Sequence, residues 1–159
     1  TVGVQIVVTA CLRTAFTRGG KGGFKDTAAA DMLVGAFKAL IERSNIDPSL
    51  VEDIAVGSVL PPGGGATEFR AAALAAGFPD TAAVKSLNRQ CSSGLQACVD
   101  IANAIKCGMI DIGIGAGVES MSLQYGYVSG VPCSLLTYLL WCPQSRSRNR
   151  ILGTPRLTP

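Results

Sequence analysis

The fold of this chain is decided by residues 83–107, which read AVKSLNRQCSSGLQACVDIANAIKC. The stretch opens with Ala83–Asn88, which we expect to form a strand. It continues into a predicted helix over Ser92–Cys107. Cys91 lies between the two, where the extended segment turns into the helix. A strand that leads directly into a helix is the unit from which α/β proteins are built.

The predicted helix has few polar residues, and they recur every three or four positions. They are Gln96, Asp100, Asn103 and Lys106. The other positions are apolar or small, so the polar stripe is narrow. A helix on a protein surface has a wide polar face. The narrow stripe therefore predicts a helix covered around most of its circumference, as a helix between two sheets is.

The rest of the core alternates strand and helix in the same way. Alternation of this kind predicts right-handed βαβ crossovers and a mainly parallel sheet, with reactive groups at the carboxyl ends of the strands. Glycines in the last expected strand allow something to approach its backbone closely. The further expected elements are a strand at Val4–Thr9, a helix capped by Asp26 or Thr27 and ending near Arg43, a strand at Ile54–Leu60, a helix over 66–76 and a strand at Asp111–Gly117.

Composition indicates one globular domain followed by a different tail. The chain has 159 residues, 48% hydrophobic and 16% charged, which is typical of a well-buried protein. Residues 1–123 hold ten Lys or Arg and eleven Asp or Glu, a net charge of −1, whereas 124–159 hold four Arg and no acid. We expect 124–159 to be a poorly ordered tail. The longest apolar tail run, Leu135–Trp141, is far short of the roughly 20 residues that span a bilayer, and neither part has the basic, aromatic-rich pattern of a nucleic-acid-binding module.

Cys91 is the candidate nucleophile. Free N–H groups and the macrodipole at a helix start favour thiolate over thiol, although most free cysteines are inert core residues. Turnover normally needs a neighbouring base, usually an imidazole, and the chain contains no histidine. Cys98 and Cys107 fall on the same predicted helix, at separations that do not favour disulfides. Without histidine or a Cys-x-x-Cys pair, we expect no metal site.

Other polar features have simpler readings. Glu119 and Asp111 are substitute bases only in principle, because a carboxylate of ordinary pKa holds a thiolate poorly at neutral pH. The glycine-rich loop Arg18–Gly23 lacks the phosphate-loop pattern, so we expect a flexible connection. Ser145–Arg148 is open to two interpretations, a phosphorylation or RNA-contact patch and a solvated tail, and composition favours the second.

Three motifs in order resemble the thiolase family, and most of all its peroxisomal 3-ketoacyl-CoA thiolases. They are NRQCSSGLQA at 88–97, GAGVESMS at 115–122 and TACLRTAF at 9–16, and the resemblance covers about 4–123. It implies an incomplete first half of a two-half αβαβα fold, with residues 1–123 as the nucleophile domain. It also implies that Cys91 takes the acyl group from a 3-ketoacyl-CoA, releases acetyl-CoA and passes the acyl group to free coenzyme A. The Cys91 backbone N–H is implied to contribute to an oxyanion hole.

The same resemblance implies a peroxisomal homodimer of fatty acid β-oxidation, with acyl-CoA and coenzyme A as substrates and no tightly bound cofactor. The cofactor-binding residues are unknown, because the family's activating histidines, Cys-x-Gly motif and coenzyme A loop are absent here. We expect the targeting segment to be missing from these residues, because they show no signal-peptide pattern. We therefore expect the chain to be the nucleophile half of a thiolase, truncated near Leu123 and inactive alone. We expect the residues after it to be an unrelated tail, such as a splice variant or a frameshift produces. The alternative is a non-catalytic isoform that binds thiolase subunits.

Overall fold

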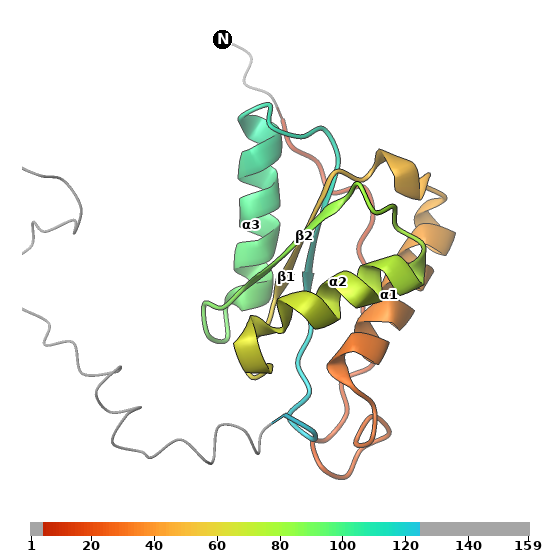
Figure 1. Cartoon of the computed structure of the whole chain (residues 1–159), viewed down its shortest axis with the longest axis vertical. Helices are drawn as coiled ribbons and strands as arrows, with labels where there is room; N and C mark the ends of the chain where they lie inside the picture. The colour runs from red at the N-terminus through yellow and green to blue at the C-terminus, as the bar shows by residue number, and fades with distance from the viewer. Residues whose placement is uncertain (1–4, 125–159) are drawn as a thin grey trace, which may run out of the picture. The chain divides into compact units, whose positions relative to one another are not determined.

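The computed structural model describes residues 5–124, which form a small three-layer α/β unit (Figure 1). The helices of this part are all too short or too polar to span a bilayer. The predicted tail, including Leu135–Trp141 and Ser145–Arg148, lies outside the described residues. The elements are α1 (Ala29–Ser44), η1 (Pro48–Leu50), β1 (Asp53–Gly57), η2 (Pro62–Gly65), α2 (Ala66–Ala76), β2 (Ala83–Leu87), α3 (Ser93–Lys106) and β3 (Gly113–Gly117).

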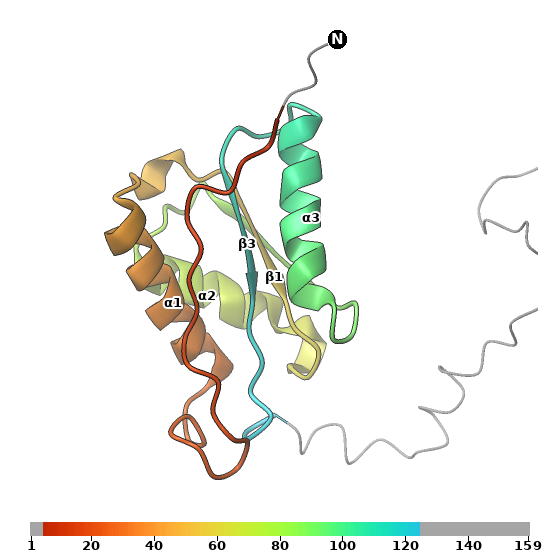
Figure 2. The ribbon, with the colours of Figure 1, turned by 180° about the vertical axis from the view of Figure 1, so that it is seen from behind.

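The three strands form a parallel sheet in the order β2-β1-β3. Ile54 of β1 is level with Val84 of β2 and Ile114 of β3. Helix α2 connects β1 to β2, and α3 connects β2 to β3. The parallel α/β fold expected from the alternating pattern is therefore confirmed. Figures 1 and 2 show α1 and α2 on one face of this sheet and α3 on the other.

Large side chains fill the space between the sheet and α1 and α2. Phe69 of α2 is fully buried, and Phe37 of α1 packs edge to face on Phe78 with ring centroids 5.4 Å apart. Ile54 and Val56 of the central strand belong to the same core. These residues form the main hydrophobic core.

Helix α3 lies close to the sheet because the strands facing it carry glycine. A Cβ atom on Gly115 would lie 2.6 Å from the Cα of Cys98, and one on Gly113 would lie 2.9 Å from Ile101. Such distances leave no room for a side chain. The close approach predicted for these glycines is thus confirmed, and α3 is the element that makes it.

The predicted strand at Val4–Thr9 is wrong for residues 5–9, which form no strand. Their β-branched side chains favour an extended chain, but a strand also needs a hydrogen-bonded neighbour. Figure 2 shows this segment running past β3 and α1 without joining the sheet. Val7 and Val8 are largely exposed as a result.

The start of α1 also differs from the prediction. The helix cap is Ala28, which offers no side-chain hydrogen bond, instead of Asp26 or Thr27. The two predicted caps lie in the preceding turn, where the Thr27 N–H donates to the Phe24 carbonyl. A capping residue must sit directly before the first helical turn, and the turn places Asp26 and Thr27 too early.

Coverage of α3 differs between its two sides. Ala97 and Ile101 are buried against the sheet, whereas Leu95 is 71% exposed and Val99 is 41% exposed. Within residues 5–124 a single sheet therefore covers α3 from one side. The second covering layer predicted from the narrow polar stripe is not among the described residues.

Candidate active site

The candidate site lies at the carboxyl edge of the sheet. Because the strands are parallel, the residues that follow β1, β2 and β3 meet at this edge. They are Ser58–Leu60, Asn88–Cys91 and Val118–Glu119. Cys91 is exposed and free, and it lies two positions before Ser93, the first residue of α3. The predicted place of Cys91, between strand and helix, is confirmed.

The turn before Cys91 has an unusual backbone. Gln90 has a φ of 51°, in the left-handed region, which costs a residue with a Cβ about 1 kcal/mol. Asn88 supports this conformation, because its Oδ1 accepts the Gln90 N–H at 2.9 Å. The buried Ser93 hydroxyl donates to the Gln90 carbonyl at 2.5 Å and accepts the Arg89 N–H at 2.8 Å. Side chains on both sides of the turn thus fix how Cys91 is presented.

Glycines bring this turn down onto the strand ends. A Cβ on Gly57, the last residue of β1, would lie 2.2 Å from the carbonyl carbon of Ser93. A Cβ on Gly117, the last residue of β3, would lie 3.0 Å from the Cα of Gly94. The first turn of α3 therefore rests directly on the backbone of two strands, and Cys91 is held just beyond them.

The two carboxylates considered as substitute bases have different places. Asp111 precedes β3, and is therefore at the amino end of the sheet, opposite to Cys91. Glu119 follows β3 at the Cys91 end, but its oxygens accept hydrogen bonds from Val59 N at 2.8 Å, Leu60 N at 3.2 Å and the Ser58 hydroxyl at 3.3 Å. A carboxylate with three donors is a structural acceptor, so the structure offers no support for either base.

The other described cysteines are Cys11, Cys98 and Cys107, all free and exposed. Cys98 donates through its sulfur to the Gly115 carbonyl at 3.6 Å. Cys133 and Cys142 lie outside the described residues. Within 5–124 there is no group of three His, Cys, Asp or Glu side chains that could hold a metal ion.

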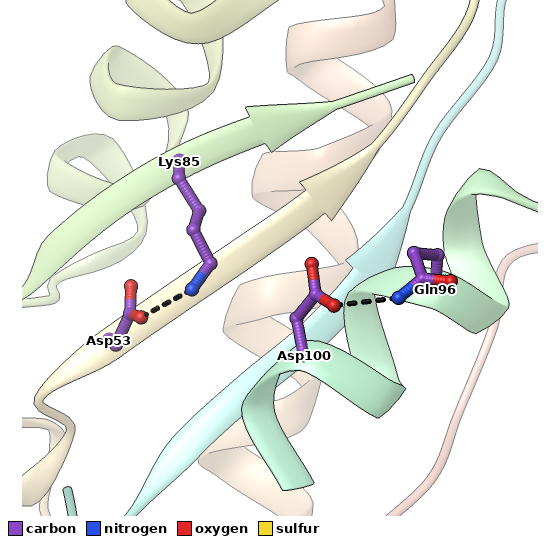
Figure 3. A network of polar contacts seen from close by, with 4 residues as sticks. All are labelled: Asp53, Lys85, Gln96 and Asp100. Carbon is purple, nitrogen blue, oxygen red and sulfur yellow. Dashed lines mark hydrogen bonds and ion pairs between the residues drawn. The ribbon is translucent and has the colours of Figure 1, made fainter. Parts of the chain in front are cut away.

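Figure 3 shows two polar pairs, one within α3 and one that joins β1 to β2. Gln96 donates to Asp100 at 2.7 Å, one turn along the helix. Lys85 of β2 forms an ion pair with Asp53 of β1 at 2.8 Å. Arg89, in the Cys91 turn, also donates to Gln96. Gln96 and Asp100, two of the four residues of the predicted polar stripe, are thus hydrogen-bonded, and Gln96 connects the stripe to the Cys91 turn.

A cavity of about 770 Å³ lies between the N-terminal segment, α1, α3 and β3. Cys98 and Gly94 line it, but Cys91 does not. The loop Arg18–Gly23, expected to be a flexible connection, contains a hydrogen-bonded turn, and its Gly20 N–H donates to the Ser122 hydroxyl at 2.9 Å. Val118 and Glu119, which follow β3 at the carboxyl edge of the sheet, also line the cavity, so the cavity borders the candidate site.

Sequence reasoning missed the two residues that shape the Cys91 turn. Asn88 follows a strand and hydrogen-bonds the backbone two residues on, which is the usual signal of an Asx turn. Ser93 had no such signal, since its two hydrogen bonds depend on the left-handed residue before Cys91. Both belong with Cys91 in the candidate site.

Comparison with known protein families identifies the family of this chain. Residues 6–137 match the family described as "Thiolase, N-terminal domain". The chain belongs to the thiolase family. The match continues to residue 137, beyond the predicted domain boundary at 123 and beyond the described residues, so that boundary stays a prediction.

Known thiolases are similar over most of the chain. It is 56% identical over 130 residues to a 3-ketoacyl-CoA thiolase of Yarrowia lipolytica, named peroxisomal, and the match covers 82% of this chain and 31% of that relative. The chain thus spans about a third of the length of that thiolase. The resemblance to peroxisomal 3-ketoacyl-CoA thiolases that the motifs predicted is confirmed.

Solved thiolases share the fold. A structure of the peroxisomal 3-ketoacyl-CoA thiolase of Saccharomyces cerevisiae matches with a TM-score of 0.73 and 48% identity over 76% of this chain and 36% of the other. That structure has five α-β-α-β-α layers built from two core domains of identical topology. A second structure, of the dimeric yeast enzyme, has a TM-score of 0.72, 48% identity, and coverage of 76% and 32%. The Acat5 thiolase of Ascaris suum, solved with coenzyme A, has a TM-score of 0.62 and 30% identity over 67% of this chain and 28% of the other. Residues 5–124 are a partial α/β unit of the thiolase fold.

Proposed function

We propose that Cys91 is the acyl-carrying nucleophile of a 3-ketoacyl-CoA thiolase, an acetyl-CoA C-acyltransferase. One observation carries this proposal: Cys91 lies exposed at the carboxyl edge of a parallel sheet, in a left-handed turn directly before α3. Nucleophiles of α/β enzymes occupy such strand-to-helix turns because the side chain is then free to meet a substrate.

The proposed chemistry has two steps. In the first, the Cys91 thiolate attacks the 3-keto carbon of the substrate, the bond between carbons 2 and 3 breaks, and its electron pair leaves with carbon 2. Carbon 2 takes up a proton, acetyl-CoA departs, and the shortened acyl group stays on sulfur as a thioester. In the second step, the sulfur of free coenzyme A attacks this thioester, and Cys91 is released as thiolate.

Within this scheme the Cys91 backbone N–H contributes to the oxyanion hole. Its position just before the N-terminus of α3 supports the assignment, because the positive end of the helix macrodipole stabilises negative charge that develops there. The proton transfers of both steps need a base and acid, usually an imidazole. Since these 159 residues contain no histidine, we expect a polypeptide of these residues alone to accept an acyl group without cycling.

Substrates, partner and location follow the same proposal. Coenzyme A and acyl-CoA are substrates, with no tightly bound cofactor, and the process is fatty acid β-oxidation in the peroxisome. The Ascaris thiolase, solved with coenzyme A, supports the substrate class, and the peroxisomal names of the yeast relatives support the location. The dimeric Saccharomyces enzyme supports a homodimer as the working form.

The test is acetyl-CoA release from a 3-ketoacyl-CoA plus free coenzyme A, followed over time with the purified 159-residue polypeptide. We expect release of no more than one acetyl-CoA per chain. Cys91→Ser abolishes it, and Cys98→Ser, a control at another exposed free cysteine seven positions along the chain, leaves it intact. Release that does not depend on Cys91 would contradict the assignment, and continuous Cys91-dependent release would contradict the need for an imidazole.

A second candidate function is binding to thiolase subunits without catalysis. The exposed Leu95 and Val99 on α3 favour it, because apolar side chains grouped on one helix face are typical of a protein contact. We expect the chain to co-purify with a tagged intact thiolase, and Leu95→Lys to weaken this. A monodisperse monomer that does not bind the tagged subunit would remove this candidate.

A further inference from the structure

Glu119 fixes the loop after β1 to the end of β3. Its Oε2 accepts the Val59 N–H at 2.8 Å, and its Oε1 accepts the Leu60 N–H at 3.2 Å. The Ser58 hydroxyl shares its single proton between the Val118 carbonyl at 2.6 Å and Oε1 at 3.3 Å. Hydrogen bonds from two successive N–H groups to an ionised carboxylate are stronger than neutral ones. The loop is therefore held at a defined distance from β3.

The same loop holds Asn88. The Val59 carbonyl accepts a hydrogen bond from Asn88 Nδ2 at 3.2 Å. The other end of this amide, Oδ1, accepts the Gln90 N–H at 2.9 Å. One side chain thus joins the loop after β1 to the left-handed residue directly before Cys91. The contacts form a continuous chain from Glu119 to Gln90 that links the carboxyl ends of all three strands.

We propose that Glu119 is a positioning residue for Cys91 and acts through Val59 and Asn88. The proposal rests on the proposed function only in taking Cys91 as the reacting group. Glu119 touches neither Cys91 nor Gln90 in this chain of hydrogen bonds. Its carboxylate keeps the Val59 carbonyl in place, Asn88 keeps its two hydrogen bonds, and Gln90 keeps the left-handed conformation that aims Cys91.

The left-handed conformation of Gln90 is the feature through which these contacts influence Cys91. A residue with a Cβ does not hold a left-handed φ without support from its surroundings. The support on the strand side is the Asn88 hydrogen bond, and on the helix side it is Ser93. Removing the Glu119 carboxylate leaves the Val59 and Leu60 N–H groups to water, so the loop shifts and Asn88 loses its fixed acceptor.

The molecule supplies a matched control at the other end of the sheet. Glu52 precedes β1, and its Oε2 accepts the N–H groups of Asp111 and Ile112, which precede β3. Glu52 therefore joins the same two strands by the same chemistry, with two successive backbone donors on one carboxylate. Its hydrogen bonds lie at the amino ends of the strands, and those of Glu119 lie at the carboxyl ends beside Cys91.

The experiment measures amide hydrogen exchange by NMR, residue by residue, in the 159-residue polypeptide and its Glu119→Ala, Glu52→Ala and Asn88→Ala variants. We expect Glu119→Ala to speed exchange at Val59 and Leu60 directly and at Gln90 remotely, the last by roughly tenfold, as the loss of one hydrogen bond allows. Asn88→Ala should speed exchange at Gln90 alike. Glu52→Ala should affect Asp111 and Ile112 and leave Gln90 unchanged. Glu119→Gln, which keeps one acceptor oxygen, should give a smaller effect at Gln90.

A second readout is the rate at which Cys91 takes an acyl group from an acyl-CoA, followed by peptide mass. This rate should fall several-fold in Glu119→Ala and stay unchanged in Glu52→Ala. Unchanged Gln90 exchange in Glu119→Ala, or an equal increase in both variants, would overturn the proposal. If Glu119→Ala does not fold, Glu119→Gln is compared with Glu52→Gln by the same criteria. Absence of acylation in the unmodified chain would contradict the proposed function alone, because hydrogen exchange tests the positioning role independently.

Discussion

The two faces of the sheet are packed in opposite ways. The face toward α1 and α2 is filled by large side chains, among them Phe37, Phe69 and Phe78. On the face toward α3, glycine and alanine bring backbone against backbone, as where Gly115 meets Cys98. Large buried side chains supply stability. Small side chains fix the distance between α3 and the sheet. The packing on the α3 face therefore determines where the turn that carries Cys91 lies.

The largest effect is expected on the aromatic face. Phe69→Ala removes a ring that is 0% exposed, and such a change costs about 3–5 kcal/mol of unfolding free energy. Phe16→Ala is the matched control, since Phe16 is 90% exposed and its loss should change the unfolding free energy by less than about 0.5 kcal/mol. Urea denaturation measures both. Equal losses at the two positions would mean that stability does not reside mainly in this face.

A smaller loss is expected from overfilling the α3 face. In Gly115→Ala the new methyl group meets the backbone of Cys98 at 2.6 Å, and overpacking of this kind costs about 1–3 kcal/mol. The same urea denaturation applies. A loss below about 0.5 kcal/mol would show that α3 moves away freely and that its distance from the sheet is not fixed.

The matched substitution on α1 should have the opposite sign. Gly35 is in the middle of α1, and an added Cβ meets nothing within 4 Å. Gly35→Ala should stabilise the chain by about 0.5–1 kcal/mol, because alanine loses less backbone entropy in a helix. Destabilisation at this position would remove the contrast between a glycine required by packing and one that is not.

The smallest effect is expected at Asp47, away from both faces. The Ser49 N–H donates to its side chain at 2.9 Å and lowers the pKa of Asp47 below the ordinary 3.8. The folded state therefore binds this proton less readily than the unfolded state. The resulting stabilisation is present above pH 3.8 and is lost as pH falls below it. In Asp47→Asn the unfolding free energy, measured by denaturation at a series of acid pH values, should lack this pH-dependent stabilisation. An identical pH dependence of the unfolding free energy in both proteins would refute the prediction.

Much of the described fold could be predicted from local patterns. Glycine and proline mark the end of α2, whose observed bounds, Ala66–Ala76, match the prediction. The alternation of strand and helix indicated a parallel sheet, and topology then placed Cys91 at its carboxyl edge. These features depend on residues near one another in sequence, which is why a single sequence contains them.

What could not be predicted depends on partners distant in sequence. Residues 5–9 have strand-forming side chains but form no strand, because strand formation needs a neighbouring edge. The role of Glu119 depends on Val59, 60 positions earlier, and on three strand ends meeting. The sequence shows a carboxylate at position 119, but only the fold shows which N–H groups donate hydrogen bonds to it.

The most direct measurement is the position of the acyl group after the chain has reacted with an acyl-CoA. Cleavage after Arg89 and Lys106 gives one peptide that contains both Cys91 and Cys98, and its fragment masses distinguish the two sulfurs. Because both cysteines are free and exposed, Cys98 is an internal standard. We expect the acyl mass on Cys91 in large excess over Cys98. Equal labelling, or labelling of Cys98 alone, would contradict the assignment of Cys91 as the acyl carrier.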